Sequence, residues 1–349
     1  MLHCLLMRYI VYGAGAIGSA LGGLLANLGR PVVLVTRTAH AHAIAKSGLI
    51  IHTKEKRLQV KVMAIESLAE ITCTTDDIIL LTNKTQDTMS AITQLASWAR
   101  PDTPIVCLQN GVRNESMAAT RFSQVIGGLV NFNANFLAPG VVERTMWNLI
   151  ALGCYPEGIN PLVEAIANDF REVGFDTHCY PQIMRAKWGK LIANLNNATN
   201  AITNTYLQQA LSNPSHKEFM AQVMAEGIMV LDRAGIPLDD GGLYDIRARL
   251  AAVYNQPAQP ADDSSEIDPL DRSYPSTWQD LTLGRKQLEV RFFNGEIVAL
   301  GVSLGLNTPY NSVLLEVVEN MAVKGEKPGR YRLAELKELV AARARKVNE

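Results

Sequence analysis

The side chains best suited to chemistry lie on a predicted helix over residues 183–203. Lys190, Asn194 and Asn197 recur at intervals of four and three residues, so they share one face of that helix. Most neighbouring positions are apolar, and burying a polar side chain without a partner costs about 1–3 kcal/mol. The pattern predicts either a polar seam between packed helices or a lysine that protonates a carbonyl oxygen while amides hold the substrate. Partial burial or a nearby positive charge would lower the pKa of this lysine, which suits a general acid.

Ser276 and Glu289 are two further polar residues in the C-terminal half of the chain. Ser276 precedes a predicted helix at residues 278–283, which its hydroxyl could cap. Glu289 could be an ordinary carboxylate on a helix surface. The functional alternative places both side chains in a cleft, where they bind the carboxylate and the hydroxyl group of a substrate.

A glycine motif at residues 13–18 follows a short predicted strand at 9–12 and precedes a predicted helix at 19–29. Its first glycine permits a tight turn, its second lets backbone approach a pyrophosphate, and its third lets the helix pack closely on the strand. The helix N-terminus supplies N–H donors and a favourable dipole for phosphates. Because strand, turn and helix occur in the required order, the motif predicts a dinucleotide site rather than a turn without a ligand. The expected cofactor contacts are Gly13, Gly15, Ala16, Ile17 and Gly18.

Arg37 follows the second predicted strand, residues 31–35, and stands nineteen residues beyond Gly18. Sites specific for NAD usually place an acid here, on the ribose hydroxyls. A guanidinium instead offers two parallel donors to a phosphate. The position therefore predicts a preference for NADP(H), with a surface arginine that has no preference as the alternative.

Lys84 and Asn110 follow two further predicted strands, at residues 77–81 and 105–108. In an open parallel sheet, ligands bind at the carboxyl ends of the strands, so both residues are expected at the cofactor or the substrate. The structural alternatives are a solvated loop lysine and an Asn-Gly turn at Asn110.

These residues need a scaffold that the rest of the sequence predicts. Strand patterns at residues 49–62, 125–135, 141–152 and 175–178 alternate with helix patterns at 38–46, 87–98 and 161–173. Helix patterns alone follow, at 183–203, 219–234, 243–254, 278–283, 295–304 and 311–324. We expect a Rossmann domain at 1–180, with a doubly wound and mostly parallel sheet, and an all-α domain at 181–349. The polar stretch 255–275 is expected to be a surface loop or a lid over the active site.

Composition limits the class of protein. A length of 349 residues suggests two domains, and 48% hydrophobic with 19% charged residues is typical of a globular chain. A net charge of −1 favours neither nucleic acid nor an anionic membrane as partner. The five cysteines are scattered, which predicts no metal site, no disulfide framework and a cytoplasmic location. We expect neither a signal peptide nor a membrane span, and a homodimer stays an open alternative.

Taken in order, these features resemble the ketopantoate reductase family (2-dehydropantoate 2-reductases) over nearly the full chain. The markers are the glycine motif, Arg37, Lys84, Gln109-Asn110-Gly111, Pro139-Gly140, Lys190 with Asn194, Ser276 with Gln279-Asp280, Gly284-Arg285, Glu289 and Asn294-Gly295. The resemblance implies NADPH-dependent hydride transfer to the keto carbon of ketopantoate, which gives pantoate for pantothenate and coenzyme A synthesis.

The resemblance also implies a role for each candidate residue. Lys190 would be the general acid, and Glu289 would contact the substrate hydroxyl. Ser276 would bind the carboxylate, while Asn110 and Asn194 would hold the substrate and the lysine. Arg37 and Lys84 would face the ribose phosphate side of the cofactor.

The chain departs from the family pattern near the substrate residues. The family usually has a second asparagine eight residues after the lysine, where this chain has Ala198, and Asn197 is expected to substitute for it. The stretch from Arg285 to Glu289 is one residue longer than usual. These departures motivate one alternative, a reductase of another keto acid or of an imine or opine-like substrate. An NADP(H)-sensing protein without turnover is the second, disfavoured because Lys190 and Glu289 are both retained.

Overall fold

The computed structural model describes residues 7–145, 148–255 and 274–345. The chain divides into two compact units, Met1–Lys187 and Trp188–Glu349, and the division falls inside helix α6 (Ile183–Asn194). Compact units are defined by packing and not by independent folding. The expected domain boundary near residue 180 therefore stays a prediction.

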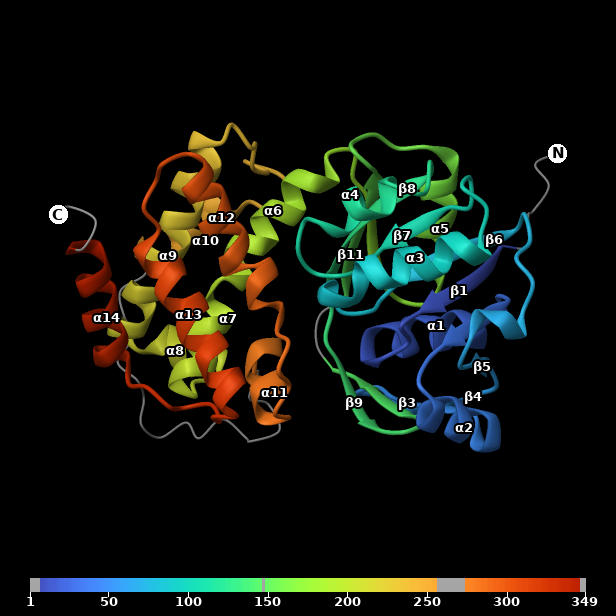
Figure 1. The fold of residues 1–349 in the computed structure, drawn as a ribbon. Coiled ribbons are helices and arrows are strands. Elements are labelled where there is room, and N and C mark those ends of the chain that lie inside the picture. The colour runs from blue at the N-terminus through green and yellow to red at the C-terminus, as the bar shows by residue number, and fades with distance from the viewer. Residues whose placement is uncertain (1–6, 146–147, 256–273, 346–349) are drawn as a thin grey trace. The chain divides into compact units, whose positions relative to one another are not determined.

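The first unit is built on an eight-stranded sheet (Figure 1). In spatial order its strands are β12 (Asp176–Cys179), β11 (Leu149–Cys154), β8 (Val125–Asn131), β7 (Ile105–Cys107), β6 (Asp77–Leu81), β1 (Arg8–Tyr12), β2 (Val32–Val35) and β5 (Met63–Ile65). Neighbouring strands are parallel except β8 and β11. The chain runs outward from β1 to β2 and β5, then crosses to β6 on the other side of β1. This reversal beside β1 is the switch point of a doubly wound fold, and it confirms the predicted fold class.

Both faces of this sheet are buried because alternate residues of each strand enter different cores. Tyr9 and Val11 join the core beneath α1 (Ala16–Asn27) and α5 (Pro161–Glu172). Ile10 joins the core beneath α3 (Thr88–Trp98) and α4 (Asn114–Ala119). Helices therefore cover both faces, as near-continuous apolar strands require (Figure 1).

A four-stranded sheet lies beside α1 in the same unit. Its order is β4 (Arg57–Val60), β3 (Leu49–His52), β10 (Val141–Arg144) and β9 (Ala134–Ala138), and α2 (Thr38–Ser47) precedes β3. The prediction of one continuous strand over residues 125–135 and another over 141–152 was wrong. Each is divided between the two sheets, because consecutive apolar strands read as one run when no glycine or proline separates them.

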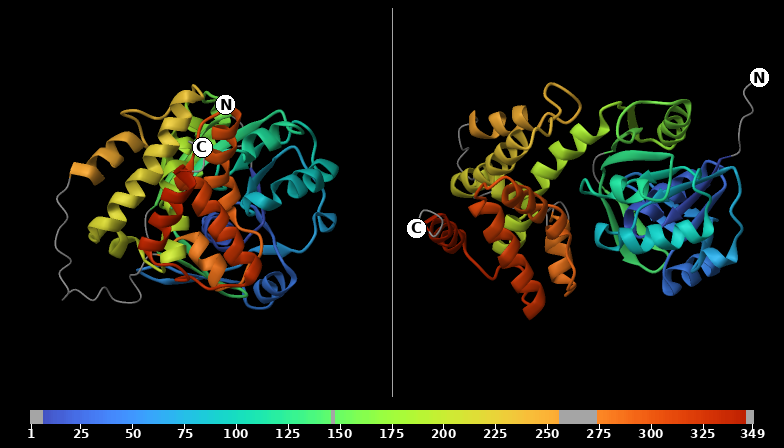
Figure 2. Two further views of the ribbon diagram at one scale, coloured as in Figure 1. Left: turned by 60° about the vertical axis from the view of Figure 1, so that its left-hand side comes forward. Right: turned by 45° about the horizontal axis from the view of Figure 1, so that its top comes forward.

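The second unit is helical, and none of its described residues forms a strand (Figure 2). After α6 its elements are α7 (Asn196–Thr203), α8 (Leu207–Ser212), α9 (Pro214–Arg233), α10 (Ile246–Asn255), α11 (Ser276–Thr282), η4 (Glu289–Phe292), α12 (Asn294–Ser303), α13 (Pro309–Lys324) and α14 (Leu333–Arg345). The single helix predicted over 183–203 is interrupted at Leu195, whose carbonyl accepts a hydrogen bond from Asn294 Nδ2 at 3.1 Å. An inserted side chain is a known cause of such a break. Most of the predicted 255–275 loop, residues 256–273, lies outside the described residues.

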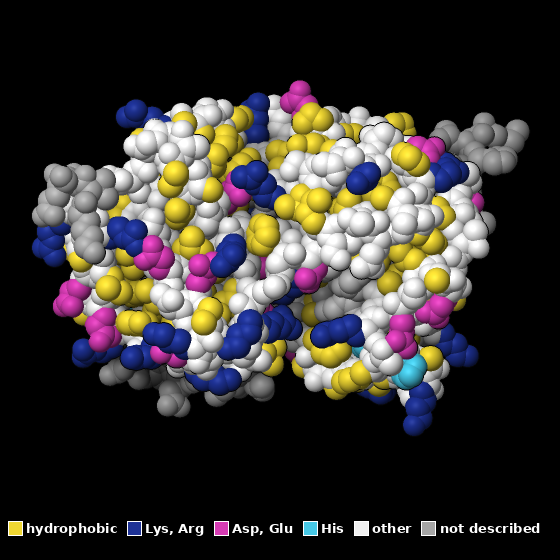
Figure 3. Space-filling view, in the orientation of Figure 1, with side chains coloured by type: hydrophobic (Ala, Val, Ile, Leu, Met, Phe, Trp, Pro, Cys, Tyr) yellow, Lys and Arg dark blue, Asp and Glu magenta, His cyan; other side chains and the backbone are white. Residues whose placement is uncertain are grey.

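The surface carries charges of both signs, and the described helices lack the features of membrane spans. On the face shown in Figure 3, acidic and basic side chains both occur over each unit, in line with the formal net charge of −1. Within the described part of the chain, no helix combines the length and the apolar character that crossing a membrane requires.

Candidate active site

The glycine motif forms the turn from β1 into α1, and its geometry matches a dinucleotide turn. Gly13 has a φ of +85°, and a Cβ there would lie 2.6 Å from the Asn83 backbone nitrogen. A Cβ at Gly18 would overlap the Thr82 side chain, so only glycine lets α1 pack this closely. A Cβ at Gly15 would meet only the Gly13 carbonyl oxygen, at 3.9 Å, which leaves open space for a pyrophosphate. Ala16 and Ile17 begin α1, where backbone N–H groups favour phosphate oxygens.

Lys84 and Asn110 lie on loops that are bonded to each other at the carboxyl edge of the sheet. The Thr85 hydroxyl donates to the Asn110 carbonyl at 2.8 Å, and Gln109 Nε2 donates to Asn83 Oδ1 at 3.3 Å. Lys84 is half-buried rather than solvated, and so is Asn110. Gly111 follows with a φ of +83°, so the Asn-Gly turn exists and presents Asn110 at this edge.

Arg37 stands exposed at the start of α2, directly after β2. Among residues 7–145, 148–255 and 274–345 it forms no ion pair and no side-chain hydrogen bond. The partial positive charge of the α2 N-terminus adds to its own charge. Both positive charges favour an anionic group here, and the Glu66 carboxylate, which accepts from the Thr38 hydroxyl in the same turn, opposes them.

A buried ion pair that the sequence did not reveal supports the Asn110 loop. The Lys187 ammonium contacts the Glu115 carboxylate and donates to the carbonyls of Gln109 at 3.2 Å and Gly128 at 3.1 Å. Both charged side chains are almost fully buried. Burial raises the pKa of Glu115, and the Lys187 charge acts in the opposite direction. These three acceptors match the three N–H bonds of the lysine, which fixes the backbone before Asn110.

In the helical unit, the lysine–amide stripe of Lys190, Asn194 and Asn197 is half-buried. Asn196 points elsewhere, because its Nδ2 donates to the Met220 carbonyl at 3.0 Å in the core. Ala198 is only 1% exposed. An asparagine at position 198 would therefore enter the core, whereas Asn197 is half-buried, as Lys190 is.

Ser276 and Glu289 occupy positions that their structural alternatives do not explain. Ser276 is the first residue of α11 rather than its cap, and Pro275 takes the cap position. Within the described part of the chain, Ser276 Oγ has no hydrogen-bond partner. Glu289 begins η4 and is 5% exposed, so it is not a surface carboxylate.

The family markers between these two residues end α11 and direct the chain toward η4. Gly284 has a φ of +67°, and its N–H donates to the Leu281 carbonyl at 3.0 Å. Arg285 N–H donates to the Asp280 carbonyl at 3.0 Å, which completes a Schellman motif. The Arg285 guanidinium also binds the buried Asp280 carboxylate at 2.5 Å. Gly284 and Arg285 therefore end α11, which begins at Ser276, and direct the chain into η4, which begins at Glu289.

A buried amide network connects α12, α13 and the α6–α7 junction. Asn294 Nδ2 bonds to the Leu195 carbonyl and to Asn311 Oδ1 at 2.9 Å. Asn311 in turn donates through its backbone N–H and through Nδ2 to Glu226 Oε1, each at 2.8 Å. Burial raises the pKa of Glu226, while the N–H groups of Asn311 and Tyr310 favour its charged form. The sequence marks Asn294 only through the Asn294-Gly295 pair, because its bonding partners are distant in the chain.

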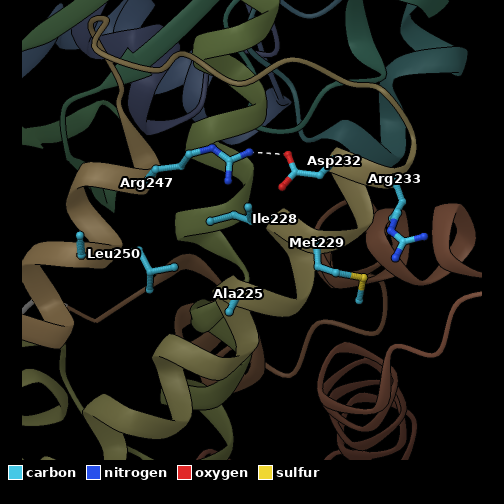
Figure 4. A pocket seen from close by; sticks show the side chains of 8 residues that line it. Ala225, Ile228, Met229, Asp232, Arg233, Arg247 and Leu250 are labelled. Carbon is cyan, nitrogen blue, oxygen red and sulfur yellow. Dashed lines mark hydrogen bonds and ion pairs between the residues drawn. The ribbon is translucent and has the colours of Figure 1, made fainter.

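A pocket of about 570 Å³ lies between α9 and α10 (Figure 4). Its lining residues are Ala225, Ile228, Met229, Asp232, Arg233, Arg247, Leu250 and Ala251. None of the candidate site residues contributes to it, so we assign the chemistry elsewhere. The first unit thus contains the glycine motif, Arg37, Lys84 and Asn110, and the second contains Lys190, Asn194, Asn197, Ser276 and Glu289.

A doubly wound sheet with a glycine turn beside its switch point, followed by a helical unit, defines the class of dinucleotide-binding oxidoreductases. Family comparison then agrees with this class. Residues 9–157 match the model described as ketopantoate reductase PanE/ApbA, and residues 182–322 match its C-terminal counterpart. A 2-dehydropantoate 2-reductase of Pyrococcus horikoshii is 32% identical over 90% of this chain and 97% of the relative. A 2-dehydropantoate 2-reductase of Pyrococcus abyssi is 30% identical over 92% of this chain and 100% of the relative.

The chain belongs to the ketopantoate reductase PanE/ApbA family, whose members are NAD(P)H-dependent oxidoreductases acting on a CH–OH group. A crystal structure of a family member from Ralstonia eutropha superposes with a TM-score of 0.77, at 27% identity, over 91% of this chain and 99% of that one. A D-mandelate dehydrogenase in a complex with NADH superposes with a TM-score of 0.79 at 23% identity, over 91% and 99%. The latter likeness concerns the fold alone.

Proposed function

We propose that this protein reduces 2-dehydropantoate to pantoate with NADPH, a step in pantothenate and coenzyme A synthesis. Family membership and the names of the two Pyrococcus relatives support the substrate. The observation that carries the mechanism is that Lys190 and Asn194 of α6 and Asn197 of α7 are all half-buried in the helical unit. A partly buried lysine with amides at neighbouring turns is suited to deliver a proton to a carbonyl oxygen.

Each residue then has a defined task. The bound cofactor supplies the hydride that the keto carbon receives. Lys190 gives the proton that the keto oxygen takes up, and Asn194 and Asn197 orient the lysine and the substrate. The Ser276 hydroxyl donates to the substrate carboxylate, and the Glu289 carboxylate accepts from the substrate hydroxyl. Donors fixed before the reaction stabilise the developing alkoxide without reorganisation.

In the cofactor site, Gly13, Gly15, Ala16, Ile17 and Gly18 form the pyrophosphate turn. Arg37 would bind the 2′-phosphate that distinguishes NADPH from NADH, with Lys84 on the same side and Asn110 toward the nicotinamide and the substrate. The fold does not choose between the cofactors, since the D-mandelate dehydrogenase of the same fold is in a complex with NADH. The exposed Arg37, which has no ion pair within the described residues, supports NADPH.

A related keto acid or imine is the second candidate substrate, and Ala198 is the observation that favours it. This alanine lies in the core where the family usually has an asparagine. If the substrate needs an amide at this place, Asn197 would have to supply it. Alanine in place of asparagine at position 198 would affect substrate binding, and it leaves the glycine turn of the cofactor site unchanged.

The test is the oxidation of NADPH and NADH at 340 nm with ketopantoate and a panel of other keto acids and imines. We expect rapid oxidation with ketopantoate and NADPH, and much slower oxidation with NADH. Lys190→Ala should lower kcat by about 10²–10⁴-fold and leave the Kd for NADPH nearly unchanged.

Lys324→Ala, an exposed lysine in the same unit, is the matched control and should keep wild-type kcat. A Lys190→Ala variant with most of its turnover would exclude the general-acid role. A hundredfold higher kcat/KM with another substrate would exclude ketopantoate and favour the second candidate.

A further inference from the structure

His40 lies in the first turn of α2 and is 3% exposed, although no role in the reaction has been assigned to it. Its Nδ1 atom is 2.8 Å from the Gly140 backbone nitrogen, in the turn between β9 and β10. Its Nε2 atom is 2.9 Å from the Ser19 hydroxyl in α1. The ring also packs against Phe136, with 4.8 Å between the ring centroids.

The chemistry of these partners fixes the direction of each hydrogen bond. A backbone N–H only donates, so His40 Nδ1 accepts from Gly140 and the proton of the neutral ring is on Nε2. Nε2–H therefore donates to Ser19 Oγ, and the Ser19 hydroxyl donates to the Ala14 carbonyl at 3.0 Å. Burial lowers the pKa of His40 to about 4, with Arg37 adding to the effect, so the ring is neutral near pH 7.

This relay ends inside the glycine motif. The Ala14 carbonyl belongs to the turn between Gly13 and Gly15, and Thr36 Oγ1 donates to the same oxygen at 3.0 Å. At its other end, His40 stands three residues after Arg37, and its backbone N–H donates to the Arg37 carbonyl at 2.9 Å. One imidazole thus joins the glycine turn to the helix that begins directly after Arg37.

We propose that His40 is a positioning residue for cofactor selection: through Ser19 it holds Arg37 at a fixed place relative to the glycine turn, so that a dinucleotide with a 2′-phosphate is preferred. The inference rests on the proposed use of NADPH. The glycine turn keeps other supports without the relay, because Gly13 and Ala14 donate to the Val35 carbonyl at 3.1 and 3.0 Å. Loss of the relay should therefore affect the 2′-phosphate more than the pyrophosphate.

The experiment measures Kd for NADPH and for NADH with the full chain, in the wild type, three single variants and one double variant. His40→Phe keeps a ring against Phe136 but removes both hydrogen bonds, and Ser19→Ala removes the middle of the relay. Both should weaken NADPH binding about tenfold and NADH binding less than about threefold. His42→Phe is the matched control, since this histidine of the same helix has a 76% exposed side chain. It should keep wild-type selectivity.

The double variant His40→Phe/Ser19→Ala should be no worse than either single variant, because both changes break one relay. Variants that keep full selectivity, or that weaken NADPH and NADH equally, would overturn the inference and indicate a merely structural role. If His40→Phe does not fold, the smaller Ser19→Ala change decides. A wild-type chain without a preference for NADPH would contradict the proposed function itself, together with the inference that rests on it.

Discussion

Ser276 and Glu289 show how the surroundings of a side chain decide between a structural and a functional interpretation. Ser276 does not cap α11, and its hydroxyl has no partner within the described part of the chain. Glu289 is buried, so it is not the surface carboxylate of its structural alternative. The Ser276 hydroxyl, without a partner among the described residues, favours contact with a polar ligand.

Ser276→Ala should raise the KM for ketopantoate at least tenfold, because a hydrogen bond to a charged group contributes about 1.5–3 kcal/mol. The effect on kcat should be smaller, since the carboxylate is bound equally in the ground state and in the transition state. Steady-state kinetics at saturating NADPH measures both values. Ser303→Ala, an exposed serine of α12, is the control. A KM equal to that of the control would remove Ser276 from the substrate site.

At the scale of elements, α6 matters most because it carries structural and candidate catalytic residues on successive turns. Lys187 is anchored in the first unit through Glu115 and the backbone before Asn110. Lys190 follows one turn later in the same helix. The anchor therefore fixes the start of the helix from which the proposed general acid projects.

Lys187→Met should lower the free energy of unfolding by about 3–5 kcal/mol, because it leaves the Glu115 charge buried without its partner. The double variant Lys187→Met/Glu115→Leu should recover most of this loss, since no charge then remains buried. Urea unfolding of the full chain measures both, with the exposed Lys46→Met as control. A single variant as stable as the control would show that the pair contributes little.

At the scale of the whole molecule, each compact unit contains, among the described residues, a buried or half-buried histidine whose pKa is lowered. They are His40 in the first unit and His216 in the second; burial is the main cause, and Arg37 and Lys337 respectively add to it. The unfolded chain takes up a proton near pH 6.5, whereas folded His40 does so only near pH 4. Stability should therefore fall as the pH decreases between these values. Glu226, whose pKa burial raises, acts in the opposite direction.

The share of His40 in this loss is about 2 kcal/mol, after allowance for solvent screening. Urea unfolding from about pH 7 to about pH 4.5 should show a smaller decrease for His40→Phe than for wild type. His42→Phe should follow the wild-type curve, since its histidine is exposed. Parallel curves for all three proteins would contradict the buried, neutral state of His40.

The fold class was predictable because its evidence is local. The glycine motif and the alternation of strand and helix patterns lie within short windows of sequence, and the structure confirms the doubly wound sheet. The division of residues 125–135 and 141–152 between two sheets was not predictable. Consecutive apolar strands carry no mark of the sheet that each will join.

The sequence by itself determined the family, the type of fold and the candidate residues, because each depends on residue type and spacing along the chain. Only the tertiary structure decided what holds these residues in place. Lys187 and Glu115 are 72 residues apart, Asn294 and Leu195 are 99 apart, and His40 and Gly140 are 100 apart. Such contacts form when distant elements pack together, and the desolvation of their polar groups makes each partner necessary to the other.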